Sequence, residues 1–146
     1  MNTEVINLVS KSQCVPVEHL LPVNCSQTGN DIPPASTRDL KPRQCFSNAF
    51  NLSVTVGCDA VVGYVFLAEF GIVIEHAWNV DERGHFDLTA QLFWDSEVSG
   101  DQYFQLLRLT PDDAIDCVSM AGGIDTLSLR HSDKHKHLFR PIREHA

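Results

Sequence analysis

Residues Ile72 to Val80 read IVIEHAWNV, and this stretch, together with Asp87 shortly after it, decides the fold. Hydrophobic residues recur at every second position, which is typical of a β-strand with two different faces. The following residues, Asp81 to Gly84, favour a hairpin loop that ends on glycine. We therefore predict a β-hairpin whose second strand runs from His85 to about Phe93.

The hairpin register follows from the length of this loop. If Val80 pairs with His85, Asp87 falls on the same sheet face as His76, one diagonal step away. Diagonal neighbours have Cβ atoms roughly 7 Å apart, which permits a carboxylate–imidazole hydrogen bond. A slip of one residue would turn Asp87 to the other face. The same register places Thr89 opposite His76, where its hydroxyl can reach Asp87.

The sequence around the hairpin predicts an α+β fold. We expect a helix from about Gln44 to Leu52, a strand within Val61–Phe70 and another strand over Tyr103–Leu109. A second helix, over residues 111–121, is indicated by Thr110 as N-cap, a proline at the first helical position and two glycines after the end.

The 146 residues are expected to form a single domain with three parts. Residues 1–42 are rich in proline and turn formers, and we expect extended segments and loops around the core, with a short strand at Val5–Val9. Residues 43–122 form the predicted core, and residues 123–146 a polar, mostly irregular tail.

The composition argues against several classes of protein. Hydrophobic residues make up 43% and charged residues 21% of the chain, which is ordinary for a soluble protein. No apolar run approaches the ~20 residues that span a bilayer, and the first residues lack a signal-peptide pattern. The formal net charge of −8 disfavours nucleic-acid binding, because phosphate contacts need a basic face. We expect a cytoplasmic protein without membrane or nucleic-acid partners.

Five widely spaced cysteines do not predict a disulfide framework or a four-cysteine zinc site. Cys45 stands out because it lies at the start of a predicted helix. A free thiol has a pKa of about 8.5, and a helix N-terminus or a neighbouring imidazolium favours the thiolate. Cys58 is a weaker candidate nucleophile, since no helix start follows it.

A thiol on a helix, an imidazole on one strand and a carboxylate on the next predict an activated cysteine nucleophile. In this interpretation Cys45 attacks a carbonyl, His76 accepts and returns the proton, and Asp87 orients the imidazole ring. The backbone N–H of Cys45 is the first expected donor to the oxyanion. The side chains that we expect to donate a second bond or to line the site are those of Gln44, Gln27, Asn30, Asn48, Trp78 and Thr89.

These residues resemble the core of transglutaminase-like cysteine enzymes, a branch of the papain-like superfamily. The resemblance lies in Cys45 near a helix start, His76-Ala77-Trp78 and Asp87-Leu88-Thr89, in that order, and covers about residues 43–91. It implies a catalytic triad of Cys45, His76 and Asp87, a cysteine-bearing helix packed on an antiparallel sheet, and no cofactor. The implied substrate is a protein, a peptide or another amide. The 31-residue step from Cys45 to His76 excludes the papain-type proteases, which need a far longer one.

Alternatives remain open at this stage. Water as the second nucleophile would give a protease, amidase or deamidase, and an amine would give a transglutaminase. The same fold can also serve as a non-catalytic binding or inhibitory module, such as a phage or bacterial accessory protein. His131, His135 and His137 are spaced like metal ligands, but no cysteine or carboxylate set completes them, and we expect no metal.

Overall fold

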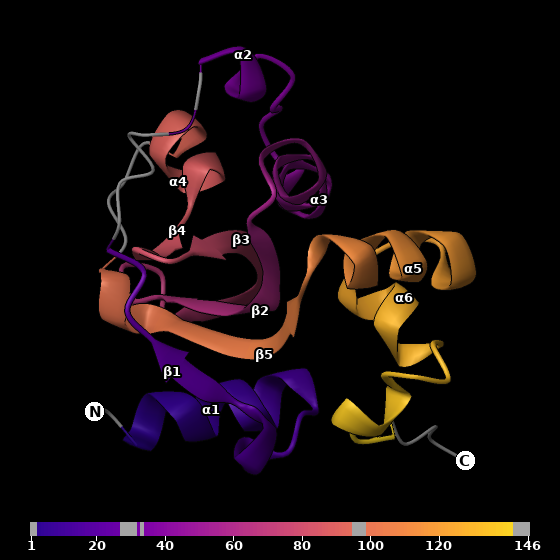
Figure 1. Cartoon of the computed structure of the whole chain (residues 1–146). Helices are drawn as coiled ribbons and strands as arrows, with labels where there is room; N and C mark the ends of the chain where they lie inside the picture. Colours follow the sequence, from indigo (N-terminus) through magenta and orange to yellow (C-terminus); the bar gives the residue numbers. More distant parts are fainter. Residues whose placement is uncertain (1–2, 27–31, 33, 95–98, 142–146) are drawn as a thin grey trace.

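The computed structural model describes residues 3–26, 32, 34–94 and 99–141. It is an α+β structure built on a curled antiparallel sheet with strand order β1-β5-β2-β3-β4 (Figure 1). The expected α+β class and antiparallel sheet are therefore confirmed. The strands are β1 (Leu21–Val23), β2 (Asp59–Leu67), β3 (Ile72–Asp81), β4 (Gly84–Phe86) and β5 (Tyr103–Leu109).

Helices surround this sheet on several sides. In Figure 1, α3 and α4 lie above the sheet, α1 lies below it, and α5 and α6 lie to one side. The helices are α1 (Thr3–Gln13), α2 (Pro34–Thr37), α3 (Cys45–Val56), α4 (Leu88–Phe93), α5 (Pro111–Ala121) and α6 (Thr126–Arg130), with 3₁₀ turns η1 (Val17–His19), η2 (Gly100–Gln102) and η3 (Lys136–Leu138).

Local signals in the sequence set the bounds of α3 and α5. In α5, Thr110 and Asp113 form a reciprocal capping box, and Gly122 ends the helix in the left-handed conformation with φ of 95°. In α3, Gly57 has φ of 87° and donates its N–H to Ser53. The helix therefore runs on to this glycine, beyond the predicted end at Leu52.

Alternation along the strands separates two apolar clusters. Val62 and Tyr64 of β2 belong to the main cluster, to which α1, α3 and α5 also contribute. Their neighbour Val61 lies in a second cluster with Trp78 and Tyr103. Trp78 and Tyr103 of the candidate site lie in this second cluster, whereas Cys45 comes from α3, which packs in the main one.

Gly63 allows the strands to approach one another closely around Trp78. A Cβ atom at this position would collide with the carbonyl oxygen of Phe104 and lie 3.0 Å from the Trp78 ring. The β2–β5 register also shifts between Val62 and Gly63. Glycine is required here by close packing, since a side chain would push the β5 backbone or the indole away.

Two predictions about the ends of the chain are wrong. Val5–Val9, expected as a strand, lies in α1, and both valines are buried because they are four positions apart and share one helix face. The segment expected to be a polar, irregular tail contains α6 and contributes Leu129 and Phe139 to the main cluster. The guanidinium of Arg130 lies over the Phe139 ring, 4.3 Å from its centre, and so covers this end of the core.

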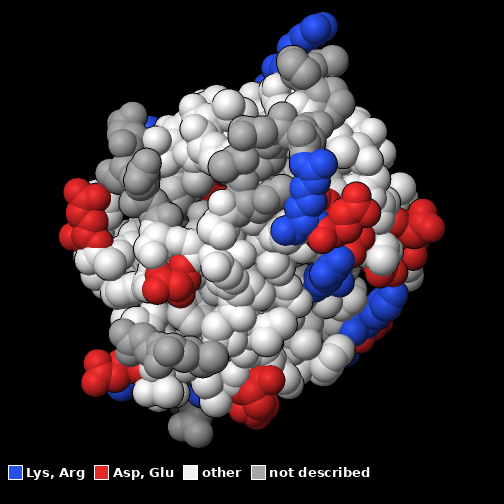
Figure 2. Space-filling view, turned by 60° about the vertical axis from the view of Figure 1, so that its left-hand side comes forward, with Lys and Arg blue, Asp and Glu red and all other residues white. Residues whose placement is uncertain are grey.

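Charged side chains are scattered over the face of the molecule drawn in Figure 2. Basic side chains lie among acidic ones on one side of this face rather than in a patch of their own. Within the described ranges, no helix combines the length and apolar character needed to cross a membrane.

Candidate functional site

His76 lies in β3 and is almost completely buried, with 2% of its surface exposed. β4 pairs with Asn79, Val80 and Asp81 of β3, so this pairing stops short of His76. The ring is surrounded by aromatic groups: its centre lies 4.8 Å from that of Trp94 and 6.3 Å from that of Trp78. This apolar environment shields the imidazole from water.

Asp87 hydrogen-bonds to His76, as the sequence predicts, although it does so from a different local structure. The His76 Nε2–Asp87 Oδ2 distance is 2.7 Å. The Val80–His85 pairing is also as predicted, but β4 ends at Phe86 and Asp87 is the N-cap of α4. Its Oδ1 accepts the N–H of Ala90 at 3.1 Å. The strand predicted over residues 85–93 is therefore wrong after Phe86, because the Asp87 carboxylate starts a helix there.

Cys45 is the first residue of α3 and is partly exposed. Its side chain lies close enough to the His76 ring to raise the pKa of the imidazole. α3 is held to β3 by the Asn79 side chain, which donates to the carbonyl of Ala49 at 3.0 Å. The structure thus places the Cys45 thiol beside the imidazole ring that Asp87 holds by a hydrogen bond.

The chain turns sharply immediately before the cysteine. Arg43 has φ of 63°, in the left-handed region that non-glycine residues rarely adopt. Gln44 follows as the N-cap of α3 with φ of −125°, and its side chain makes no capping hydrogen bond. The Gln44 side chain is exposed. Two further candidates for an oxyanion donor, Gln27 and Asn30, lie outside the described residues.

Asn48 and Thr89 hold the framework of the site together and do not reach the triad by any hydrogen bond in the described part of the chain. The Asn48 amide accepts the N–H of Lys41 at 3.0 Å, donates to its carbonyl at 2.8 Å and donates to Thr89 Oγ1 at 3.0 Å. This buried bridge ties the loop before Cys45 to α3 and α4. The predicted bond from Thr89 to Asp87 is absent among the described residues, because Thr89 lies in α4 and faces Asn48.

The ionisation of His76 reflects two opposing effects. Burial alone lowers the pKa of His76, whereas the charge of Asp87 and the hydrogen bonds with Asp87 and Cys45 raise it to about 9. The raising effects prevail, so the imidazolium is favoured at neutral pH. A buried cation between a carboxylate and a thiol is an arrangement that stabilises a thiolate.

Tyr103 and Cys25 also lie at the site, although neither was predicted from the sequence. The Tyr103 hydroxyl donates to Asp87 Oδ2 at 2.6 Å from the first position of β5. Burial and then the Asp87 charge raise the pKa of Cys25 well above its usual range. No local sequence signal marks either contact, since both depend on how distant strands pair.

Trp78 forms a wall of the site. Its Nε1–H donates to His85 Nδ1 at 3.0 Å, and its ring meets the Tyr103 ring edge-on at 5.1 Å. Burial and the charge of Arg108 lower the pKa of His85, which keeps Nδ1 free to accept this bond. Trp78 therefore packs against the triad and is fixed by its own hydrogen bond.

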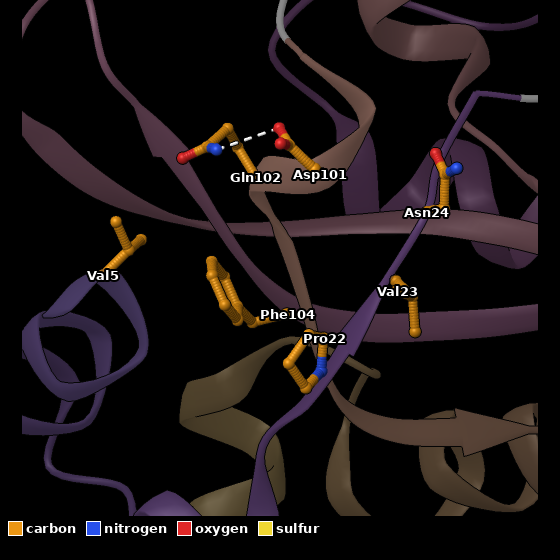
Figure 3. Close-up of a pocket in the computed structure, with 7 residues that line it drawn as sticks. All are labelled: Val5, Pro22, Val23, Asn24, Asp101, Gln102 and Phe104. Carbon is orange, nitrogen blue, oxygen red and sulfur yellow. Dashed lines mark hydrogen bonds between the residues drawn. The ribbon is translucent and has the colours of Figure 1, made fainter. Parts of the chain in front are cut away.

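Other cavities and thiols of the described structure are distinct from this site. A cavity of about 260 Å³ lies between α1, β1 and β5, lined by Val5 and Phe104 among others (Figure 3). Phe104 belongs to the main cluster, whereas Tyr103 belongs to the second one, so this cavity opens on the other face of the sheet. Burial raises the pKa of Cys58, the rival nucleophile, to about 11.

Within the described ranges, no three His, Cys, Asp or Glu side chains are arranged to hold a metal ion. His135 of the tail is buried instead, and burial and the charge of Lys134 lower its pKa. No known protein family, curated protein or solved structure matches this chain. The chemistry of the site therefore has to be inferred from its own geometry.

Proposed function

We propose that this protein is a cysteine-dependent acyl-transfer enzyme that forms a thioester on Cys45. The observations that carry this proposal are the short His76–Asp87 hydrogen bond and the Cys45 thiol close enough to the ring to raise the pKa of His76. A partly exposed sulfur at a helix start, next to a buried imidazole fixed by a carboxylate, is the kind of arrangement that nucleophilic catalysis uses.

The proposed reaction begins when the Cys45 thiolate attacks the carbonyl carbon of an amide. The carbon–nitrogen bond breaks, and the leaving amine takes a proton from His76. Water or a second amine then attacks the thioester carbonyl and gives a proton back to His76. The carbon–sulfur bond breaks, and Cys45 leaves as the thiolate. Asp87 keeps the ring oriented and stabilises its charged form throughout. Water gives hydrolysis or deamidation, and an amine gives transamidation.

The order and placement of these groups support a transglutaminase-like or papain-like core. Cys45 lies at the N-terminus of a helix, His76 on an antiparallel strand and Asp87 directly after the next strand. This arrangement resembles the triad of that superfamily. The first oxyanion donor in the proposal is the backbone N–H of Cys45, which a first-turn position leaves without a partner inside the helix.

Alkylation of the thiols tests the proposed activation of Cys45. The full chain is treated with iodoacetamide between pH 6 and pH 7, and the labelling rate of each cysteine is read by mass spectrometry. Cys45 is expected to react faster than a free peptide thiol, while Cys25 and Cys58 react slowly because burial raises their pKa. His76→Ala should slow the labelling of Cys45 strongly, whereas His137→Ala, an exposed site, should not.

A second step separates an enzyme from a binding module with the same fold. An activated ester such as p-nitrophenyl acetate should acetylate Cys45 and release nitrophenol in a burst, and Cys45→Ser should remove the burst. Added amine should compete with water if the site transfers acyl groups. Labelling of Cys45 no faster than that of a peptide thiol, with no acetyl adduct, would favour the non-catalytic binding or inhibitory module.

A further inference from the structure

We propose that Tyr103 is a positioning residue of the candidate site: its hydroxyl holds the Asp87 carboxylate against His76 and limits how strongly that carboxylate binds the ring proton. This inference rests on the proposed function, because it assigns Tyr103 a part in setting the charge of the His76 base. It adds a fourth group, contributed by another strand, to Cys45, His76 and Asp87.

One oxygen of Asp87 receives two short hydrogen bonds. Oδ2 lies 2.7 Å from His76 Nε2 and 2.6 Å from the Tyr103 hydroxyl. The other oxygen, Oδ1, accepts the N–H of Ala90 at 3.1 Å. Asp87 is 3% exposed, so these donors replace the water that would otherwise surround its charge. Tyr103 therefore competes directly with His76 for the same oxygen atom.

The support that Tyr103 gives is rigid because β5 lies inside the sheet. At this residue β5 pairs with Val23 of β1 on one side and with Val65 of β2 on the other. The Tyr103 ring also packs edge-on against Trp78, with an interplanar angle of 81°. Asp87, by contrast, lies at a junction between a short strand and a six-residue helix. Because Tyr103 is fixed in the sheet, its hydrogen bond fixes the Asp87 carboxylate relative to the sheet.

The hydroxyl remains a donor across the working pH range. Burial and then the charge of Asp87 raise the pKa of Tyr103 far above its usual range. In the described part of the chain, two thiols are the other ionisable groups near the His76–Asp87 pair: Cys45 on α3 and Cys25 after β1. Burial raises the pKa of Cys25. A carboxylate that loses a hydrogen-bond donor becomes a stronger base. Removing the hydroxyl should therefore strengthen the hold of Asp87 on the His76 proton.

Tyr103→Phe tests this inference, with Tyr64→Phe as the matched control. Tyr64 is buried on β2 in the main cluster, and its hydroxyl has no hydrogen-bond partner among the described residues. His76 is titrated by nitrogen-15 NMR in each full-length protein. We expect Tyr103→Phe to raise the His76 midpoint by about one pH unit, since a hydrogen bond to a charged group is worth about that much or more. Tyr64→Phe should leave the midpoint unchanged.

Fluorotyrosine provides a test that removes no atom from the network. The chain has two tyrosines, so in Tyr64→Phe a biosynthetically incorporated 3-fluorotyrosine replaces Tyr103 alone. The fluorinated hydroxyl is a stronger donor and should lower the His76 midpoint, opposite in sign to Tyr103→Phe. This measurement also serves if Tyr103→Phe does not fold.

The role of Tyr103 would be overturned if the His76 titration midpoint stayed fixed in both Tyr103→Phe and the fluorotyrosine protein. It would also be overturned if the midpoint fell in Tyr103→Phe or rose in the fluorotyrosine protein. Tyr103 would then be a core aromatic residue. Labelling of Cys45 in the same samples keeps the two proposals separate. Fast labelling of Cys45 with an unmoved His76 midpoint refutes the role of Tyr103 alone. A shifted midpoint with an unreactive Cys45 refutes the proposed function.

Discussion

Replacing Asp87 with asparagine should change the pH dependence of stability in a direction that the structure fixes. Asparagine has nearly the same shape and is as good an N-cap as aspartate, so α4 keeps its start. The charge beside His76 is lost. We therefore expect Asp87→Asn to abolish the raised pKa of His76, and burial should then lower that pKa below its ordinary value.

The size of the effect follows from the shift in the native protein. The pKa of His76 rises from 6.5 to about 9 on folding, and each unit is worth about 1.4 kcal/mol. A raised pKa means that the folded state binds the proton more tightly than the unfolded chain. This contribution, about 3 kcal/mol, is complete below pH 6.5 and is lost as the pH rises through 9.

Urea unfolding at a series of pH values between 6 and 10 measures this difference. The free energy of unfolding of the native chain should exceed that of Asp87→Asn most at pH 6, and the gap should close by about 3 kcal/mol towards pH 10. Taking the difference between the two proteins cancels the titration of distant groups. Parallel curves, with a constant gap at every pH, would refute a protonated His76 in the folded state.

Two further substitutions test the framework of the site by urea unfolding. Gly63→Ala should destabilise the protein by about 2 kcal/mol or more, because its Cβ would meet the Phe104 carbonyl and the Trp78 ring; an unchanged midpoint would show that the strands can separate at no cost. Asn48→Ala should cost about 2–3 kcal/mol, because it removes two part-buried bonds to the Lys41 backbone and leaves the buried Thr89 hydroxyl without its bond. It should also slow the alkylation of Cys45, and a stability loss without that slowing would assign Asn48 to packing alone.

Local patterns in the sequence were enough to place the hairpin and the helix that carries the cysteine. The turn residues fix the Val80–His85 pairing, and alternation marks β3. The start of α3 was predicted to within one residue, at Cys45. These features depend on neighbours in the chain, which is why periodicity and turn chemistry are sufficient to find them.

The errors occur where a local pattern was ambiguous or where the contact is distant in the chain. The prolines between residues 16 and 42 suggested extended segments and loops with a short strand at Val5–Val9, but those residues lie in α1, which ends before the first proline. Tyr103 meets Asp87 from β5, and the position of β5 depends on its pairing with β1 and β2. A propensity argument cannot supply this contact, because it depends on the strand order of the sheet.

The correct contact between Asp87 and His76 and the incorrect strand after His85 have the same physical cause. In a continuing strand the Asp87 side chain would have to reach His76 along a diagonal of roughly 7 Å between Cβ atoms. As an N-cap, Asp87 leaves the strand, gives Oδ1 to Ala90 and turns Oδ2 towards both His76 and Tyr103. The start of α4 and the orientation of the imidazole therefore depend on one carboxylate. Asp87→Asn keeps the cap while removing the charge, so it separates the helix-forming role of this residue from its effect on His76.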